Sequence, residues 1–428
     1  MSETTPDTRK AASRRASARE WFAVVSLTAA TFSITATEML PVGLLTPMSE
    51  GLGITEGVAG LTVTLVGVTA ALAAPAVPLL LGRLDRRTAL VLLMSLLTAA
   101  NALSAAAPSL GVLLAARVAV GVALGGVWAV AASQAVRLVP AGSAGAAISA
   151  VFSGIGLASV LAVPAGTMLA ELTDWRMAFT AATGLALSVT AALALLLPSL
   201  PPEAPVRPRE LFRLFGNRRL RLGLVFLALL VTGHFAAYTY VRPVLEKVSG
   251  VAPGLIGVVL LAYGVAGIAG NFGAGAVATR APRAVLLTLS AGIALATALL
   301  ALGGGLTPFA VAVLLLWGVA YGGVSVSGQA WMLATAPGSR EPAGALFASV
   351  FNACIALGAF TGGRVVDGAP LRTVLWLGAA LAAVALVVMA VGGRTRGPGS
   401  GRTRHDGDAG AAGRRTGQDR ESVVASLS

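Results

Sequence analysis

The feature that most constrains this chain is a series of twelve apolar runs, each long enough to cross a lipid bilayer. A helix needs about 20 consecutive apolar residues to span the hydrocarbon core. We predict spans at approximately 21–45, 58–81, 88–107, 110–135, 142–170, 175–197, 220–245, 255–279, 284–302, 308–335, 343–366 and 371–391. The stretches between them are mostly short, so a soluble domain has little room. The chain is therefore expected to be an all-α membrane protein with twelve transmembrane helices.

The composition supports the bilayer as the solvent of this chain. Charged residues make up 11% of it and hydrophobic residues 56%, whereas roughly 25% of a soluble domain is charged. Cys354 is the single cysteine, which excludes an internal disulfide and a cysteine metal cluster. The spans show no clustered acids, metal ligands or nucleophile with a base, so we expect neither an enzyme nor a cofactor other than protons as the coupling ion.

The distribution of basic residues predicts the orientation. If the N-terminus is cytoplasmic, 25 of the 31 Lys and Arg residues fall on that side, as the positive-inside rule requires. We then expect the net charge of +13 to interact with anionic lipids rather than with nucleic acid. We expect a multi-pass protein of the inner (plasma) membrane with both termini cytoplasmic: a basic N-terminus at 1–20 and a disordered tail at 392–428, because the tail is too polar to fold.

An internal repeat divides the spans into two halves. Three pairs of similar segments recur at offsets of 202, 197 and 199 residues. The pairs are 36–42 with 238–244, 121–127 with 318–324, and 149–152 with 348–351. A near-constant offset in three spans indicates duplication. We predict six-helix bundles at 21–197 and 220–391, related by a pseudo-two-fold axis and joined by a cytoplasmic linker at 198–219, the arrangement of major facilitator transporters.

Three ionisable residues lie within the spans: Glu38, Arg117 and His234. Each is costly in a bilayer and should face a cavity or a partner. Because spans one and seven correspond in the repeat, Glu38 and His234 are candidates for protonation on one central cavity. The alternative for Glu38 is a carboxylate at the outer mouth, hydrogen-bonded to Thr35 or Thr37. Arg117 either anchors span four or couples transport to proton movement.

A substrate would bind polar and aromatic side chains of the spans that line the cavity. Such groups can stack on a planar solute and form hydrogen bonds with it, although each of them is individually more common as a packing residue. The candidates are Phe32, Trp128, Ser133, Gln134, Phe235, Tyr238, Tyr240, Gln329, Trp331 and Asn352.

Several segments carry a resemblance to a known family. They are 37–48 (TEMLPVGLLTPM), 85–87 (DRR), 125–129 (GGVWA), 137–140 (RLVP) and 174–176 (DWR). They resemble the twelve-span drug:proton antiporter branch of the major facilitator superfamily, and within it the purine ribonucleoside efflux pump group, with arabinose-type and chloramphenicol exporters as relations. The likeness implies a coupling role for Arg117. It also implies conformational roles for Gly82, Asp85, Arg86 and Arg87 in the loop and for Gly156, Pro164 and Gly166 in a span-five hinge.

The chain departs from the family pattern at two of these places. Gly82 precedes Asp85 by three residues rather than four, no second glycine follows Arg86, and Pro164 lacks the preceding glycine. The function expected is proton-coupled efflux of a small, purine-ribonucleoside-like molecule by a monomer whose two bundles rock around a central cavity. A broad exporter of amphiphilic drugs such as phenicols, or a sugar exporter, is the alternative.

Overall fold

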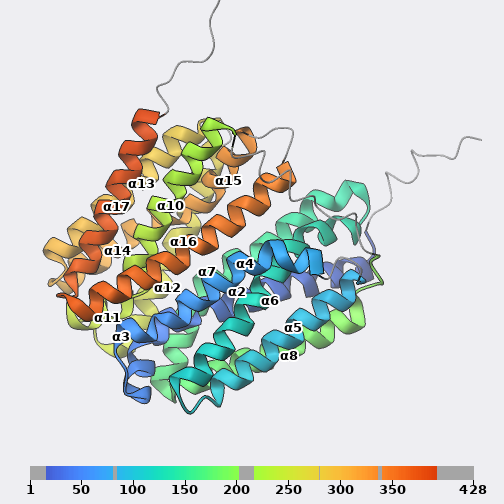
Figure 1. Ribbon diagram of the computed structural model, residues 1–428, viewed down its shortest axis with the longest axis horizontal. Helices are drawn as coiled ribbons and strands as arrows, with labels where there is room; N and C mark the ends of the chain where they lie inside the picture. The colour runs from blue at the N-terminus through green and yellow to red at the C-terminus, as the bar shows by residue number, and fades with distance from the viewer. Residues whose placement is uncertain (1–15, 81–83, 202–215, 279, 336–339, 393–428) are drawn as a thin grey trace, which may run out of the picture. The chain divides into compact units, whose positions relative to one another are not determined.

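The computed structural model describes residues 16–80, 84–201, 216–278, 280–335 and 340–392, and this part of the chain forms helices without strands (Figure 1). Twelve helical segments are long and apolar enough to span a membrane, as predicted. The expected tail, most of the basic N-terminus and most of the linker lie outside the described residues, as does Gly82.

Six spans form the N-terminal half and six the C-terminal half. The first half consists of α2 (Ala18–Leu52), α3 (Glu56–Ala59) with α4 (Leu61–Leu80), α5 (Arg86–Ala105), α6 (Leu110–Arg137), α7 (Ala144–Leu172) and α8 (Trp175–Leu196). The second consists of α10 (Arg218–Tyr238) with α11 (Val241–Lys247), α12 (Pro253–Ala278), α13 (Pro282–Gly303), α14 (Thr307–Gly322) with α15 (Val324–Thr335), α16 (Arg340–Gly368) and α17 (Arg372–Gly392).

Three spans expected to be continuous are interrupted. The second breaks at Gly60 between α3 and α4. The seventh breaks between α10 and α11 just before Pro243, which has no amide hydrogen to continue the helical ladder. The tenth breaks at Gly323 between α14 and α15. In contrast, α2 runs without a break through Pro41 and Pro47.

The packing repeats in the two halves. In the first, α2 packs on α7, α4 on α6 and α5 on α8. The equivalent pairs in the second half are α10 on α16, α12 on α14 and α13 on α17 (Figure 1). The sequence duplication is therefore a structural duplication, and the fold is that of two related six-helix bundles.

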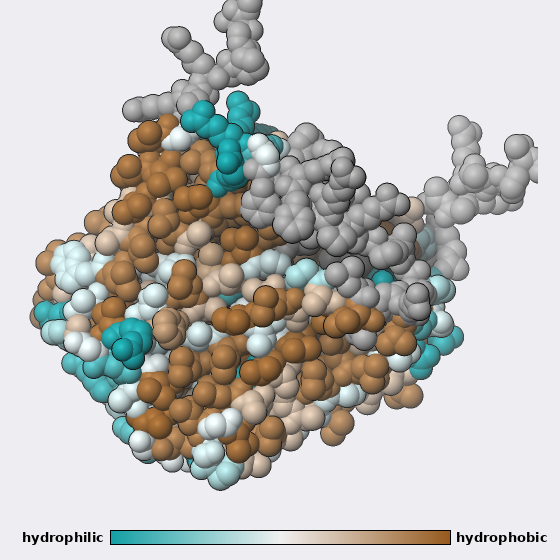
Figure 2. Space-filling view, in the orientation of Figure 1, coloured by the Kyte–Doolittle hydropathy of each residue, from teal (hydrophilic) through white to brown (hydrophobic). Residues whose placement is uncertain are grey.

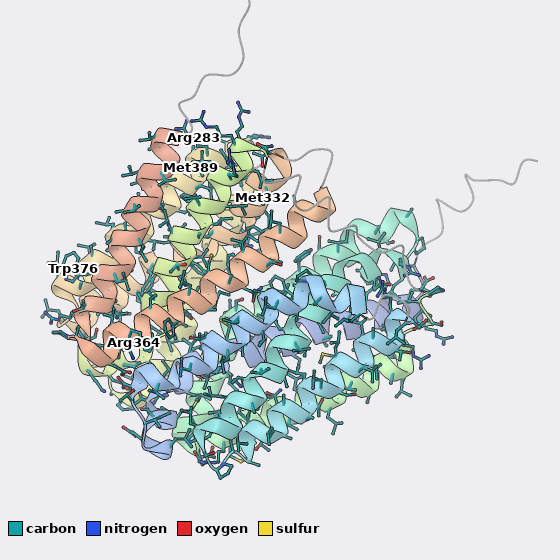
Figure 3. The ribbon with its side chains drawn as sticks, in the orientation of Figure 1. Arg283, Met332, Arg364, Trp376 and Met389 are labelled. Carbon is teal, nitrogen blue, oxygen red and sulfur yellow. The ribbon has the colours of Figure 1, made fainter. Side chains whose placement is uncertain are left out.

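The helices have two chemically distinct ends. We call the end from which α8 and α10 lead to the linker the linker end, and the opposite end, where α2 and α16 finish, the far end. Figure 2 shows apolar side chains over the flanks of both bundles and polar ones gathered at the ends. At the linker end, Arg283 Nη2 donates to the carbonyl oxygens of Met389 (3.3 Å) and Ala390 (2.8 Å), whereas Arg364 lies toward the other end (Figure 3).

The two halves meet mainly where α4 packs on α16 and α7 packs on α12. Glycine allows this approach: a Cβ on Gly67 would lie 2.8 Å from the Asn352 carbonyl oxygen. A hydrophobic cluster of the C-terminal half extends into the first half through Met39, Val42 and Val63, among others. These contacts lie between the middle of the helices and the far end.

Gly121 supplies a test of the packing within the first half. A Cβ at this position would lie 1.7 Å from Thr69 Oγ1 and 2.6 Å from the Val66 carbonyl oxygen of α4. We expect Gly121→Val to lower the free energy of unfolding by more than about 2 kcal/mol, since overpacking forces backbone shifts. Gly111→Val, on the same helix with open space around it, is the matched control. Equal thermal stability of the two variants in detergent would contradict the packing.

Candidate functional site

Glu38 lies near the middle of α2 and is only 4% exposed. Its Oε1 has no hydrogen-bond partner, and among the described residues no hydrogen bond joins it to Thr35 or Thr37. Thr37 Oγ1 instead accepts a hydrogen bond from Asn101 Nδ2 of α5 at 3.0 Å. An ionisable group with an unpartnered buried oxygen is costly in a bilayer and marks a functional position.

Arg117 is fully buried in α6 and bonded to the same turn of α2. Its Nη1 donates to the Thr37 carbonyl oxygen at 3.2 Å, and its Nη2 donates to Ser104 Oγ at 2.7 Å. The guanidinium carbon also lies 4.8 Å from the ring centroid of Phe179 in α8, a favourable cation–π position. Arg117 thus connects four helices of one bundle and places its positive charge beside the backbone that carries Glu38.

An aromatic cluster faces this region from the C-terminal half. It consists of His234, Phe235 and Tyr238 in α10, Tyr263 in α12, and Trp317 and Tyr321 in α14. The His234 and Tyr321 rings are stacked with centroids 3.3 Å apart and an angle of 2° between their planes. Trp317 Nε1 donates to His234 Nδ1 at 3.1 Å. The cluster gathers aromatic rings from three helices at mid-depth, and such rings can stack on a planar solute.

Glu38 and the aromatic cluster are treated as one candidate site. The carboxylate of Glu38 is an electrostatic neighbour of the Tyr321 phenol across the interface of the halves. His234 Nε2 and Tyr263 Oη are, like Glu38 Oε1, buried without a hydrogen-bond partner. Such unpartnered groups cost about 1–3 kcal/mol each. A site that leaves three of them open is suited to a ligand that supplies the missing partners.

Polar contacts close the far end between the halves. Arg242 of α11 forms ion pairs with Glu171 at the end of α7 and with Glu246, whose Oε1 lies 2.8 Å from Arg242 Nε. Its Nη1 donates to the Gly43 carbonyl oxygen at 2.7 Å. Thr46 Oγ1 donates to Glu246 at 2.6 Å.

A second group of contacts closes the far end beside the first. The side chain of Thr55 and the amide of Gly57 donate to the Asp367 carboxylate at 2.9 and 3.1 Å. Lys247 lies 2.9 Å from Glu56. Between described residues, every hydrogen bond and ion pair that joins the two halves lies at this end, so the bundles are held together there.

The far-end contacts can be tested with a cysteine reporter. Replacing Arg242 by Met leaves Glu171 and Glu246 unpaired, and breaking a buried pair in this way is strongly destabilising. We expect a Cys at Ala59, which is fully buried, to react with an impermeant maleimide at least about tenfold faster when Arg242→Met is added to the Cys354→Ser background; tenfold corresponds to about 1.4 kcal/mol. Arg176→Met, which removes a half-exposed arginine, should change nothing. Unchanged labelling in Arg242→Met would contradict the seal.

Residues 27–344 match the family model of the Major Facilitator Superfamily. The protein belongs to this superfamily. Among solved structures, a bacterial homolog of the human lysosomal transporter Spinster in an inward-facing, unoccupied conformation has a TM-score of 0.73 at 15% identity, covering 89% of this chain and 98% of that one. The fold is thus that of major facilitator transporters.

Two curated relatives span nearly the whole major facilitator region. The chain is 33% identical over 371 residues to the purine ribonucleoside efflux pump NepI of Escherichia coli O6:K15:H31, covering 86% of this chain and 94% of the relative. It is also 33% identical over 382 residues to the transcription regulatory protein OpdE of Pseudomonas aeruginosa, covering 88% and 95%. This major facilitator protein is accordingly a transporter of a small molecule.

The structure brings only some of the predicted substrate residues together. Phe235 and Tyr238 lie in the aromatic cluster with His234. Tyr240 is buried between the halves, where its hydroxyl donates to the Ala359 carbonyl oxygen at 2.7 Å, a sealing position. Asn352 Nδ2 donates to its own helix at Ala348 (2.9 Å).

Other predicted substrate residues lie away from the cluster or have local partners. Gln134 accepts a hydrogen bond from Arg137 at 2.9 Å near the linker end. Trp331 Nε1 donates to the Arg219 carbonyl oxygen at 3.2 Å, also near that end. The remaining candidates are Phe32, Trp128 and Gln329, which are half-buried, and Ser133, whose side chain lies outside the described part.

The loop before α5 makes its described contacts within its own half. Asp85 caps α5 by accepting from the amide of Arg87 at 2.9 Å, and it accepts from Ser199 Oγ at 2.6 Å. The Arg86 amide donates to the Leu200 carbonyl oxygen at 2.8 Å, and Arg87 donates to a carbonyl near the end of α8. In this conformation the loop ties α5 to the end of the first bundle.

The expected hinge residues of α7 have different surroundings. A Cβ on Gly156 would meet nothing within 4 Å, whereas one on Gly166 would lie 2.5 Å from the Leu40 side chain. Pro164 is buried inside the helix, and its carbonyl faces Gly257 of α12. The proline thus lies where α7 contacts the other half.

Asp85 gives a prediction about stability and pH. Partial desolvation tends to raise its pKa, but hydrogen bonds from Ser199 and from backbone amides hold the pKa below its usual value. Its stabilising effect is therefore lost as the pH falls through this lowered pKa. We expect Asp85→Ala to lower the free energy of unfolding by about 1 kcal/mol at pH 7, and Asp85→Asn, which also caps helices, by less. The difference in stability between wild type and Asp85→Ala should shrink below about pH 3.9. A difference in thermal unfolding that stays constant with pH would contradict this prediction.

The structure also shows contacts that the sequence analysis did not predict. Arg242 and Lys247 fall on the non-cytoplasmic side in the predicted orientation, which is poor in basic residues, and both pair with acids of the first half. A basic residue on that side is an exception to the positive-inside pattern. The exception itself was the available signal for the far-end contacts, whereas nothing in the sequence connected Trp317 with His234.

Proposed function

We propose that this transporter exports a small, purine-ribonucleoside-like solute in exchange for protons, by alternating access in the inner membrane. The observation that carries the proposal is Glu38: a buried acid with an unpartnered oxygen, between the Arg117-linked backbone of one half and the aromatic cluster of the other. The efflux-pump relative supports the direction and the solute.

The orientation follows from charge. The linker end carries most of the basic residues and so faces the cytoplasm under the positive-inside rule. Because the Arg242 and Asp367 contacts hold the far end closed, we infer an inward-facing conformation. Opening outward requires these contacts to break while the cytoplasmic ends of the bundles approach each other.

Glu38 is suited to carry the proton. A carboxylate in a closed, dry site is favoured in its protonated form, while contact with water favours the charged form. When the bundles rock, Glu38 in the first half changes its surroundings relative to Tyr321 in the second. Substrate binding and proton binding then compete for the same site, which is the requirement for exchange.

The site favours a nucleoside over the alternatives. Flat rings provide stacking, and three unpartnered polar atoms provide hydrogen bonding. A broad exporter of phenicol-like drugs needs little hydrogen bonding, and a sugar has no aromatic ring to stack. The heteroaromatic base of a purine ribonucleoside uses both.

Proteoliposomes with an imposed pH gradient test the proposal. We expect the gradient to drive labelled inosine, with accumulation lost when an ionophore dissipates the gradient, and to leave a labelled phenicol unmoved. The control is protein-free liposomes carrying the same pH gradient. Movement of the phenicol alone would favour the drug exporter, and inosine flux that is independent of the gradient would contradict proton exchange.

A further inference from the structure

The aromatic cluster contains a hydrogen bond that fixes the chemical state of His234. The indole N–H of Trp317 is only a donor, and it points at His234 Nδ1 across 3.1 Å. Nδ1 must therefore carry a lone pair, and the neutral ring carries its hydrogen on Nε2. A second hydrogen on Nδ1 would place two donors against each other. The contact thus selects one tautomer and opposes the charged ring.

The ring is also held in its orientation. Tyr321 stacks on it at 3.3 Å between centroids, and Tyr238 lies 5.1 Å away at an angle of 19°. Turning the imidazole over would exchange its two nitrogens only by leaving both rings. The contact cannot be predicted from the sequence, because α10 and α14 bring together His234 and Trp317, which are 83 positions apart.

The opposite nitrogen has no partner. His234 Nε2 is buried and unbonded, although a buried N–H normally has an acceptor. We propose that His234 is a fixed hydrogen-bond donor to an acceptor atom of the transported solute, and that Trp317 is the positioning residue that keeps the ring in its Nε2–H tautomer. The inference rests on the proposed function and separates His234 from Glu38, leaving proton carriage to Glu38.

The surroundings contain few groups that could change the charge of the ring. The titratable neighbours are Tyr238 on the same helix, Tyr321 on α14, Tyr263 on α12 behind Tyr238, and Glu38 of α2, which acts on Tyr321. All of the tyrosines are neutral at physiological pH. Glu38 is the one carboxyl group among these neighbours, and it belongs to the other half.

Of the remaining helices packed on α10, α16 brings the titratable Cys354 beside Thr232, whose Oγ1 donates to the Cys354 carbonyl oxygen at 3.5 Å. Next to Gly233 and Phe235 they bring Gly358 of α16 and Gly378 and Leu381 of α17. Because His234 and Trp317 lie in the same bundle, a rigid-body rocking motion leaves their hydrogen bond intact. The donor is then preserved in every state, while the distance to Glu38 changes.

Nuclear magnetic resonance of ring-¹⁵N-labelled histidine tests the tautomer directly. The chain has only two histidines, His234 and His405, so a full-length His405→Ala variant in nanodiscs leaves one pair of signals. We expect a neutral ring protonated at Nε2 from pH 5 to pH 8. Trp317→Phe should produce a mixture of the two neutral tautomers, because no donor then requires the lone pair on Nδ1. A wild-type ring that titrates, or that carries its hydrogen on Nδ1, would overturn the inference.

Paired amide variants test the donor. Glutamine places its amide nitrogen near the position of Nε2, whereas asparagine places it near that of Nδ1. We expect His234→Gln to bind inosine within about threefold of wild type and His234→Asn at least about tenfold more weakly, which is about 1.4 kcal/mol. Equal affinities would overturn the donor role. The nuclear magnetic resonance measurement needs no substrate, so a His234 ring that titrates overturns this inference alone. If the pH gradient drives no inosine movement, the proposed function is overturned instead.

Discussion

Replacing Glu38 by Gln is expected to abolish gradient-driven accumulation of inosine while leaving inosine binding within a few-fold of wild type. The amide keeps the size and hydrogen-bonding capacity of the protonated acid but cannot release a proton. Without release, the empty transporter has no step that couples to the gradient. Accumulation should fall at least about 100-fold, equivalent to about 2.7 kcal/mol.

The matched control lies on the same helix. Glu50 is an exposed acid near the far end of α2, and Glu50→Gln should transport normally. Flux and binding are measured on the same proteoliposome preparations. Full accumulation in Glu38→Gln would show that another group carries the proton.

The second large effect is expected at Arg117. Arg117→Met removes the buried charge together with the donors to the Thr37 carbonyl and to Ser104, so the turn of α2 that carries Glu38 loses its attachment to α6. We expect inosine accumulation to fall at least about 100-fold. Arg117→Lys should recover little, because one ammonium cannot replace two guanidinium donors and the stacking on Phe179.

Arg176 provides the control for Arg117. It also lies over an aromatic ring of the first half, with its guanidinium carbon 4.2 Å from the Trp175 centroid, but its side chain is 34% exposed. Arg176→Met should retain transport, since partly exposed contacts contribute little. Normal accumulation in Arg117→Met, with normal thermal stability, would contradict the coupling role.

The sequence predicted the spans because hydrophobic length is a local property. The twelve spans and the duplication were confirmed by the helices and their repeated packing. The breaks at Gly60, near Pro243 and at Gly323 were missed, because a glycine or proline in an apolar run does not by itself indicate a break; α2 continues through Pro41 and Pro47. Whether a proline interrupts a helix depends on the neighbouring helices that satisfy the freed backbone groups.

The site was predicted only in part, for a physical reason. Ionisable residues in apolar runs are visible in a sequence, and so Glu38, Arg117 and His234 were found. Their partners are not visible, because Trp317 is one aromatic among many until the fold places it 3.1 Å from His234. Trp331 could not be distinguished from it for the same reason, although its indole binds a backbone oxygen near the linker end.

The most direct test of the central claim measures proton movement caused by the solute. Proteoliposomes containing a pH-sensitive dye, with no imposed gradient, receive inosine outside. Exchange of protons through Glu38 predicts that inosine entry raises the internal pH in wild type, and that Glu38→Gln exchanges labelled for unlabelled inosine without any pH change. Inosine entry without a pH change in wild type, or the same pH change in Glu38→Gln, would contradict it.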